Sequence, residues 1–262
     1  MIFDAHVHVG QFENSYYNPY IIVNLLKQNG VYGAYISSTT SCIKWDNIHE
    51  KKLVVEHIQA ELREALFTAQ NIGFEAKPLC WLIPQRFVEG ETLEDVYSEG
   101  QHYGFKIHPR AHDWDINKSA IQKLMNRVCA CAADLNVPVW IHTGTSNFES
   151  PRLFEHWYCE FPSVKFVIAH CKDIESSIRM MEKYPNVYGD VAFLPPAFLD
   201  YFGERGCLKK MVFGSDFPIT AFSDTEDNII NTVQLNRNYR KILSDWKGHL
   251  QLLGDVNKIL VY

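Results

Sequence analysis

The sequence predicts an α/β protein, a single (β/α)8 TIM barrel spanning residues 1–262, and three observations support this. Strand-like and helix-like segments alternate along the chain, with no Pro/Gly/Ser-rich linker and no low-complexity segment. Several strand candidates are nearly continuous apolar runs, such as Val139-Trp140-Ile141, which suit parallel strands buried on both faces. The length of 262 residues is that of one such barrel.

Eight segments have strand character, because each is a short run dominated by β-branched, aromatic and other apolar residues. In chain order they are Ile2–His8, Val31–Ser37, Lys77–Ile83, Tyr103–His108, Pro138–His142, Lys165–His170, Asn186–Val191 and Met211–Asp216. Amphipathic segments with helical spacing alternate with them: Pro19–Gln28, Lys51–Ile72, Thr92–Glu99, Asn117–Leu135, Pro151–Phe161, Asp173–Lys183, Pro196–Phe202 and Asp224–Ser244. We expect the tail, Gly248–Tyr262, to form a short helix or extension that closes the barrel bottom.

A doubly wound open sheet is the alternative fold. It would place a Gly-x-Gly-x-x-Gly turn after the first strand, where this chain reads His8-Val9-Gly10-Gln11. The barrel is therefore the better prediction.

Composition excludes several classes of partner. The net charge is -6 with no basic stripe, which argues against nucleic acid. No run of about 18 apolar residues is present, so we expect no membrane span. The strand pattern starts at Ile2, leaving no room for a signal peptide, and the seven cysteines are scattered without a Cys-x-x-Cys pair. Reduced thiols and a cytoplasmic location are the expectation.

The first apolar run ends in His6 and His8, one residue apart. Residues i and i+2 of a strand point to the same face, so both imidazoles project together at the carboxyl end of the first strand. Two neutral imidazoles that converge on one point are half of a transition-metal site. Taken alone, the pair also fits two surface histidines that meet by chance.

The ends of the other predicted strands decide between a metal site and a chance pair of surface histidines. Barrel enzymes take their functional groups from the carboxyl ends of the strands. The side chains found there are His6, His8, Lys106, His108, His142, His170 and Asp216. Five of the eleven histidines thus lie on one predicted rim.

In these residues the chain resembles the amidohydrolase superfamily, and more narrowly the amidohydrolase-related branch that includes the aminocarboxymuconate-semialdehyde decarboxylase type. The resemblance covers nearly the whole chain, because four short motifs occur in order. They are Asp4-Ala5-His6-Val7-His8, Trp140-Ile141-His142-Thr143-Gly144, Ile168-Ala169-His170-Cys171 and Gly214-Ser215-Asp216-Phe217-Pro218.

The resemblance implies roles for five of the residues. His6, His8 and His142 would bind the metal, and Asp216 would touch it and take a proton from its bound water. His170 would polarise the substrate or act in proton transfer. Three imidazoles and one carboxylate suit one Zn²⁺ ion, and Mn²⁺ or Fe²⁺ accept the same ligands. An open coordination position would lower the pKa of a bound water toward neutrality.

Lys106, His108 and Arg110, at the end of the fourth strand, have two readings. In two-metal members of the superfamily a lysine here is carboxylated and bridges the metals. Lys106 and His108 would then hold a second ion together with His142 and His170. In one-metal relatives a Lys-x-His-Pro segment orients or binds an anionic substrate, and we favour this reading.

Other residues of the expected catalytic face are weaker candidates. Arg86 could clamp a substrate carboxylate, and Asp190 could hold a histidine tautomer. Residues that could wall a pocket are Trp45, Tyr16, Tyr17 and Phe193. His112 is a weaker site candidate, and the remaining histidines, His49, His57, His102, His156 and His249, are expected to be structural or solvated.

The predicted function is that of a metal-dependent hydrolase, in which activated water cleaves an amide, ester or lactone-type bond of a small anionic or aromatic substrate. The alternative is a metal-dependent decarboxylase, a carbon–carbon lyase acting on an unsaturated or aromatic carboxylic acid. It ranks second because the chain is short for such enzymes. A metal-free ligand-binding barrel is the third reading, and the filled ligand positions argue against it. The expected partner is a small-molecule substrate, and a homodimer is left open.

Overall fold

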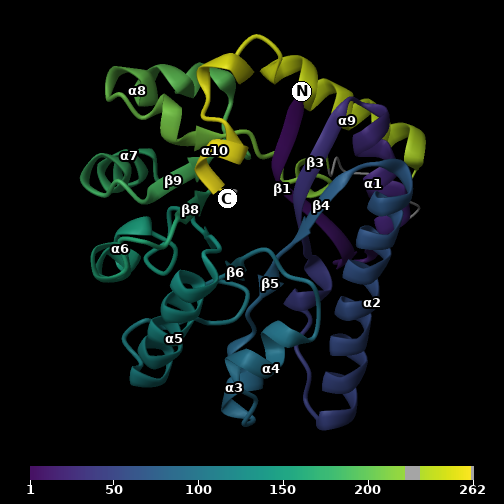
Figure 1. The fold of residues 1–262 in the computed structure, drawn as a ribbon, viewed down its shortest axis with the longest axis vertical. Helices are drawn as coiled ribbons and strands as arrows, with labels where there is room; N and C mark the ends of the chain where they lie inside the picture. The colour runs from purple at the N-terminus through teal and green to yellow at the C-terminus, as the bar shows by residue number, and fades with distance from the viewer. Residues whose placement is uncertain (222–230, 261–262) are drawn as a thin grey trace.

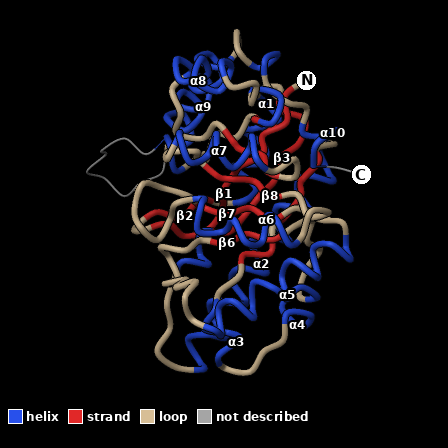
Figure 2. Tube along the Cα trace, turned by 90° about the vertical axis from the view of Figure 1, so that its left-hand side faces the viewer, coloured by secondary structure: helices blue, strands red, loops and turns tan. Residues whose placement is uncertain are grey.

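A computed structural model describes residues 1–221 and 231–260 of the chain. Parallel strands form the centre of the molecule and helices lie around them (Figures 1 and 2). The parallel strands are β1 (Ile2–Phe12), β3 (Val31–Ser38), β4 (Glu75–Pro78), β5 (Cys80–Trp81), β6 (Phe105–Ile107), β7 (Val139–His142), β8 (Phe166–Ala169), β9 (Val187–Asp190) and β10 (Met211–Val212). The α/β class expected from the sequence is confirmed.

The strands follow one another in barrel order. β1, β3 and β4 pair in one sheet, and β5 to β10 pair in a second. Only Leu79 separates β4 from β5, so the two act as one strand that joins the sheets. At the other junction, Ala5 N donates to Phe213 O and Asp216 N donates to His6 O, both over 2.8 Å. These bonds bring the segment after β10 against β1 and complete the ring.

Helices cover the outside of the ring. They are α1 (Pro19–Gln28), α2 (Ile48–Ile72), α3 (Pro84–Val88), α4 (Leu93–Ser98), α5 (Ser119–Leu135), α6 (Glu155–Glu160), α7 (Ile174–Lys183), α8 (Leu199–Glu204), α9 (Thr232–Trp246) and α10 (Val256–Leu260). Apolar faces of α1, α2 and α9 pack on β1 and β3, and those of α4 to α8 pack on β5 to β10. None of the helices in the described ranges is long and apolar enough to cross a bilayer.

A separate apolar cluster fills the lower part of the barrel interior. It includes Phe3 and Ala5 of β1, together with inward residues of the other strands. Val256 and Leu260 of α10 pack against it, so the C-terminal helix closes the barrel bottom as the tail was expected to do (Figure 1).

β1 contains an irregularity that decides which of its side chains face inward. Asp4 pairs with Ala34, and Val7 pairs with Ile36. Between these two pairs β1 advances by three residues and β3 by only two, so β1 contains a β-bulge. A β-bulge changes the direction in which the side chains that follow it point. Phe3 and Ala5 face the barrel interior before it, whereas Val7 and Val9 face the outer core after it. His6 and His8 consequently point into the barrel.

Several element boundaries differ from the prediction. β1 runs on to Phe12 and pairs with an antiparallel strand, β2 (Ser15–Tyr17), where a loop was expected. β10 ends at Val212, because the following residues contact β1 through isolated bonds and Asp216 has a φ of 55°. The last long helix begins at Thr232, and residues 224–230, the first part of its predicted range, lie outside the described residues.

The fold places the candidate side chain of Arg86 in a structural role. It lies in α3, is 5% exposed, and its guanidinium bonds to Glu91 and Glu99. Lys51 of α2 also pairs with Glu91 and lies 2.8 Å from Glu89. Arg86 is therefore neither a substrate clamp nor a solvated surface arginine, the two interpretations that its sequence position allowed, because it is buried and carboxylates of the chain already occupy its donors.

We predict that Arg86→Met lowers the free energy of unfolding by about 2–3 kcal/mol, because it leaves two partly buried carboxylates unpaired. Urea unfolding measures this. The matched control is Arg127→Met, which breaks an ion pair between exposed partners, Arg127 and Glu94, and should cost about 0.5 kcal/mol or less. Equal losses in the two variants would contradict the structural role.

The same network predicts a pH dependence. Burial by itself raises the pKa of Glu91, but hydrogen bonds from Arg86 and Lys51 outweigh it and leave the pKa below its usual value. The stabilisation of the fold by ionised Glu91 is complete above the glutamate pKa of about 4.3 in the unfolded chain. It is lost as the pH falls through the lower pKa of Glu91 in the folded protein. The stability difference between the native protein and Arg86→Met should therefore shrink below about pH 4. A difference independent of pH would contradict it.

Candidate functional site

The strand ends bring a buried polar cluster together at the carboxyl end of the barrel. Its central members are His6, His8, Lys106, His170 and Asp216, each at most 5% exposed. They come from β1, β6, the residue after β8 and the segment after β10. Groups that are far apart in the chain thus share one water-poor space.

The closest contacts join the two β1 histidines to Asp216. His6 Nε2 and His8 Nε2 lie 3.1 Å and 2.9 Å from Asp216 Oδ1. His6 Nδ1 lies 2.8 Å from Asp190 Oδ2, and His8 Nδ1 lies 3.0 Å from Ser37 Oγ. Since an ionised Asp190 can only accept, His6 carries its proton on Nδ1 and turns the Nε2 lone pair toward Asp216. Asp190 thus holds a histidine tautomer, as expected from the sequence.

Burial sets the charge states of these groups. The pKa of His6 lies well below its usual value, because burial and then the nearby Lys106 disfavour the imidazolium. Burial raises the pKa of Asp216, but the adjacent His6 and His8 outweigh it and the pKa is lowered. A neutral imidazole and an ionised carboxylate are the forms that bind metal.

These groups fit a cation. Lone pairs of His6 Nε2 and Asp216 Oδ1 face each other, and His8 Nε2 adjoins the same oxygen. Among the described residues, His6, His8 and Asp216 form one group whose ligand atoms lie within 4.8 Å of one another. His6, His170 and Asp190 form a second. His142 belongs to neither, and its assignment as a metal ligand remains a prediction.

His170 reaches the cluster through an unusual backbone conformation. Val167 and Ala169 of β8 face the barrel interior, so regular alternation would turn His170 outward. Its φ of 70° lies in the left-handed region and redirects the side chain, which stacks on His6 with ring centroids 5.0 Å apart. Such conformations cost energy in residues other than glycine and concentrate at functional sites. The strain indicates that this placement matters.

His142 links His170 to a carboxylate that the sequence analysis missed. His142 Nδ1 lies 3.0 Å from His170 Nε2, and His142 Nε2 lies 3.3 Å from Glu149 Oε1. Ser146 Oγ donates to Glu149 over 2.6 Å. The hydrogen bond from His142, despite burial, lowers the pKa of Glu149 to about 2. Glu149 follows β7 in a rim loop, and only that position could have suggested it.

The residues after β6 surround one side of the cluster. Lys106 Nζ lies 2.9 Å from His6 Nε2, and burial lowers the pKa of this amine to about 8. His108 is half-buried and stacked on the rings of Trp81 and His142, and Arg110 is exposed. Arg110 lines a cavity of ≈ 500 Å³ together with Lys118, Phe148 and Glu149. The cavity adjoins the His142–Glu149 contact.

The other candidates separate into two groups. Phe193 contacts the His170 ring at 5.3 Å and is half exposed, and Tyr16 is exposed. Trp45 and Tyr17 are instead buried in apolar clusters, because they pack under α2 and α1. His112 is largely buried, 6.4 Å from the Trp81 ring centroid.

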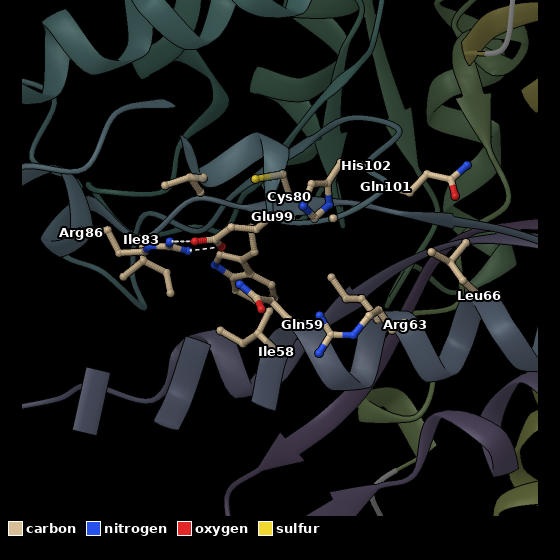
Figure 3. A pocket seen from close by; sticks show the side chains of 14 residues that line it. Ile58, Gln59, Arg63, Leu66, Cys80, Ile83, Arg86, Glu99, Gln101 and His102 are labelled. Carbon is tan, nitrogen blue, oxygen red and sulfur yellow. Dashed lines mark hydrogen bonds and ion pairs between the residues drawn. The ribbon is translucent and has the colours of Figure 1, made fainter. Parts of the chain in front are cut away.

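A smaller cavity lies outside the barrel, between α2 and β5 (Figure 3). Its lining includes Ile58 and Arg63 of α2, and the Arg86–Glu99 ion pair stands at one end (Figure 3). Its volume of ≈ 40 Å³ holds little more than a water molecule. It is too small for a substrate.

A parallel α/β barrel with His and Asp at the carboxyl ends of its strands defines the class of barrel enzymes that work at this face. The chain belongs to the amidohydrolase family, whose model matches residues 56–245. That family generally uses divalent metal ions. No curated protein matches the chain.

Similar solved structures support the fold. An amidohydrolase II structure is 15% identical with a TM-score of 0.60, covering 93% of this chain and 100% of that one. 4-Oxalomesaconate hydratase from Rhodopseudomonas palustris is 12% identical, with a TM-score of 0.51 and coverages of 96% and 98%. An aldolase from Escherichia coli K12 is 13% identical, with a TM-score of 0.52 and coverages of 98% and 93%. At these identities the likeness concerns the fold alone.

We predict that Asp190→Asn weakens Zn²⁺ binding by about 10–100-fold, because the amide no longer holds the His6 proton on Nδ1. A zinc titration against a competing chelator measures the affinity. Asp113→Asn is the control, because the Asp113 carboxylate is exposed and pairs with Lys44. Unchanged zinc affinity in Asp190→Asn would contradict an orienting role.

Proposed function

We propose that the chain is a metal-dependent hydrolase that cleaves an amide, ester or lactone-type bond of a small anionic or aromatic substrate. The observation that carries the proposal is the convergence of His6, His8 and Asp216 in a buried site at the carboxyl end of the barrel. Family membership supports an enzyme that uses a divalent metal.

The proposed ligands of one divalent cation are His6, His8, His142 and Asp216. Nitrogen and carboxylate donors of this kind favour Zn²⁺, with Mn²⁺ or Fe²⁺ as alternatives. When bound, the cation supplies a Lewis-acid centre that activates water. A second ion bridged by a carboxylated Lys106 is less favoured, because the amine lies 2.9 Å from His6 Nε2 and so occupies space within the cluster.

Asp216 and His170 are the proposed catalytic residues. Asp216 is ionised, buried and next to both β1 imidazoles, so its Oδ1 can accept a proton from the attacking water. His170 is stacked on the His6 ring, and its Nε2 lies 3.0 Å from His142 Nδ1. If His142 Nδ1 turns to the cation, the Nε2 proton of His170 is free to donate a hydrogen bond to the oxygen on which negative charge develops. Removal of such a donor typically slows a reaction about 10²–10³-fold.

The substrate-binding side is proposed to lie along Lys106, His108 and Arg110. Lys106 and Arg110 supply cationic groups that suit an anionic group, and Arg110 lines a cavity that also contains Asp113, Asp115 and Glu149. The exposed ring of Phe193 beside His170 supplies an apolar surface for the rest of a small molecule.

Decarboxylation is the second candidate, because a buried ammonium beside Asp216 could also hold the carboxylate of an acid that loses CO₂. Release of labelled CO₂ from unsaturated or aromatic acids, compared with hydrolysis of esters, lactones and amides, separates the two reactions. CO₂ release without any hydrolysis would replace the hydrolase proposal.

We predict that the native protein contains about one divalent metal per chain and that His6→Ala loses most of it, as elemental analysis of protein purified without chelator can show.

Asp216→Asn should lower turnover of a hydrolysed substrate about 10²–10⁴-fold. His156→Ala, which removes an exposed histidine of α6, is the control. Full activity in Asp216→Asn, or a native protein that takes up no metal, would overturn the mechanism.

A further inference from the structure

Glu149 is a buried carboxylate in a loop on the rim of the barrel. It follows β7 in the loop 143–150, and it is only 5% exposed. The loop folds back on itself, because Gly144 N donates to Glu149 O and Glu149 N donates to Ser146 O, both over 3.1 Å. A glutamate is rarely buried unless its charge is paired, so the partners of this carboxylate indicate its role.

Both oxygens of the Glu149 carboxylate have a partner. Ser146 Oγ donates to Oε2 over 2.6 Å, and Oε1 lies 3.3 Å from His142 Nε2. A Cβ atom at Gly144 would lie 2.9 Å from Oε2, so a side chain there would displace the carboxylate from this position. An ionised carboxylate only accepts hydrogen bonds, so the proton of the contact with His142 is on Nε2.

This contact decides which nitrogen of His142 keeps a lone pair. With Nε2 turned to Glu149, Nδ1 is the ring atom left for a cation, and it lies 3.0 Å from His170 Nε2. Two neutral rings whose nitrogen atoms lie at that distance share one proton. That proton belongs to His170 Nε2 when His142 Nδ1 has the lone pair. The carboxylate of Glu149 therefore determines the proton positions on both rings.

The other two proposed histidine ligands follow the same pattern. The Nδ1 atoms of His6 and His8 lie 2.8 Å and 3.0 Å from an oxygen atom of a neighbouring side chain. In the part of the chain that the structure describes, the buried Nδ1 of His170 has no hydrogen-bond partner. Metal-binding histidines almost always have a partner on the second nitrogen, which groups His142 with His6 and His8 rather than with His170.

We propose that Glu149 is a positioning residue that holds the His142 proton on Nε2. It thereby keeps the Nδ1 lone pair of His142 for the cation and the Nε2 proton of His170 for donation. The proposal rests on the proposed function in taking His142 as a metal ligand. It adds a residue of the loop 143–150 to the site and names the nitrogen through which His142 would bind.

The tautomer of His142 is tested first, in metal-free, ¹⁵N-labelled protein at about pH 8, above the ordinary histidine pKa of about 6.5. Two-bond ¹H–¹⁵N spectra distinguish protonated from unprotonated ring nitrogens, and the signals lost in His142→Phe assign the ring. The expected result for the native protein is a proton on Nε2 and none on Nδ1. A proton on Nδ1 would overturn the proposal.

Two substitutions of Glu149 then separate its acceptor oxygen from its packing. Glu149→Leu has no acceptor, so the His142 proton should move to Nδ1, where His170 Nε2 can accept it. Glu149→Gln keeps an acceptor oxygen and should keep the native tautomer. Thermal unfolding shows whether each variant is folded. An unchanged tautomer in folded Glu149→Leu would show that the carboxylate does not hold the proton, and the proposal would fail.

Zinc alone is the second probe, in a titration against a competing chelator. Glu149→Leu should bind zinc about 10–100-fold more weakly than the native protein, and Glu149→Gln should recover most of that loss. Glu155→Leu is the matched control, because this partly exposed glutamate of α6 pairs with Lys183, and zinc affinity should be unchanged. Native affinity in Glu149→Leu, or an equal loss in Glu149→Leu and Glu149→Gln, would contradict positioning through the acceptor oxygen.

These results are separable from a failure of the proposed hydrolase. A native protein that takes up no zinc would remove the hydrolytic mechanism and the role of His142 as a ligand. The tautomers of the native protein and of the two Glu149 variants would still decide whether Glu149 positions His142, because they are measured without metal and without turnover.

Discussion

The site depends on the bulge in β1. A regular strand with Phe3 and Ala5 facing inward would turn His6 and His8 out of the barrel, because side chains alternate with a period of two. One extra residue between Asp4 and Val7 reverses the alternation. The lower half of β1 can then pack in the apolar interior, while the upper half carries imidazoles into the polar site.

Asp4 holds this bulge in place. Its Oδ1 accepts hydrogen bonds from His6 N and Ser215 N, and its Oδ2 accepts one from Tyr239 of α9. Burial raises the pKa of this carboxyl to about 6, so the charged form is kept at a cost that the three donors partly offset. Asp4 thus joins the bulge of β1 to the segment that carries Asp216. A buried carboxylate outside the barrel supports the chemistry inside it.

Hydrogen-bond partners also offset the cost of burying the polar groups of the site. Removing imidazoles, an ammonium and carboxylates from water is costly unless each finds a partner. Asp190 accepts from His6 and from the backbone N–H groups of His170 and Ala192, so one carboxylate orients two parts of the rim. The positive φ at His170 and at Asp216 adds strain at two of the proposed catalytic residues. The apolar cluster below the site and the helices around it supply the stability that such a site requires.

Much of the fold could be predicted because apolar periodicity is a local property. Helix α1 begins and ends where its pattern predicts, and the runs at β3, β7 and β8 agree within a residue or two. Prediction failed where the apolar periodicity was weak. The short helix α3 was expected to be a loop, and Arg86 to be solvated or to clamp a substrate. Its carboxylate partners are contributed by a separate turn and by the residue after α4, so no local pattern pointed to them. Glu149 was missed because its contact with His142 arises from loop geometry.

The sequence by itself determined which chemical groups reach the carboxyl ends of the strands, because each strand end is defined by local pattern and parallel strands end on the same side. It therefore predicted His6, His8, Lys106, His108, His142, His170 and Asp216 as rim residues. Only the tertiary structure decided their directions and protonation. The bulge in β1, the left-handed backbone at His170 and the contact of Glu149 with His142 depend on how neighbouring strands and loops pack, and no local pattern encodes those contacts.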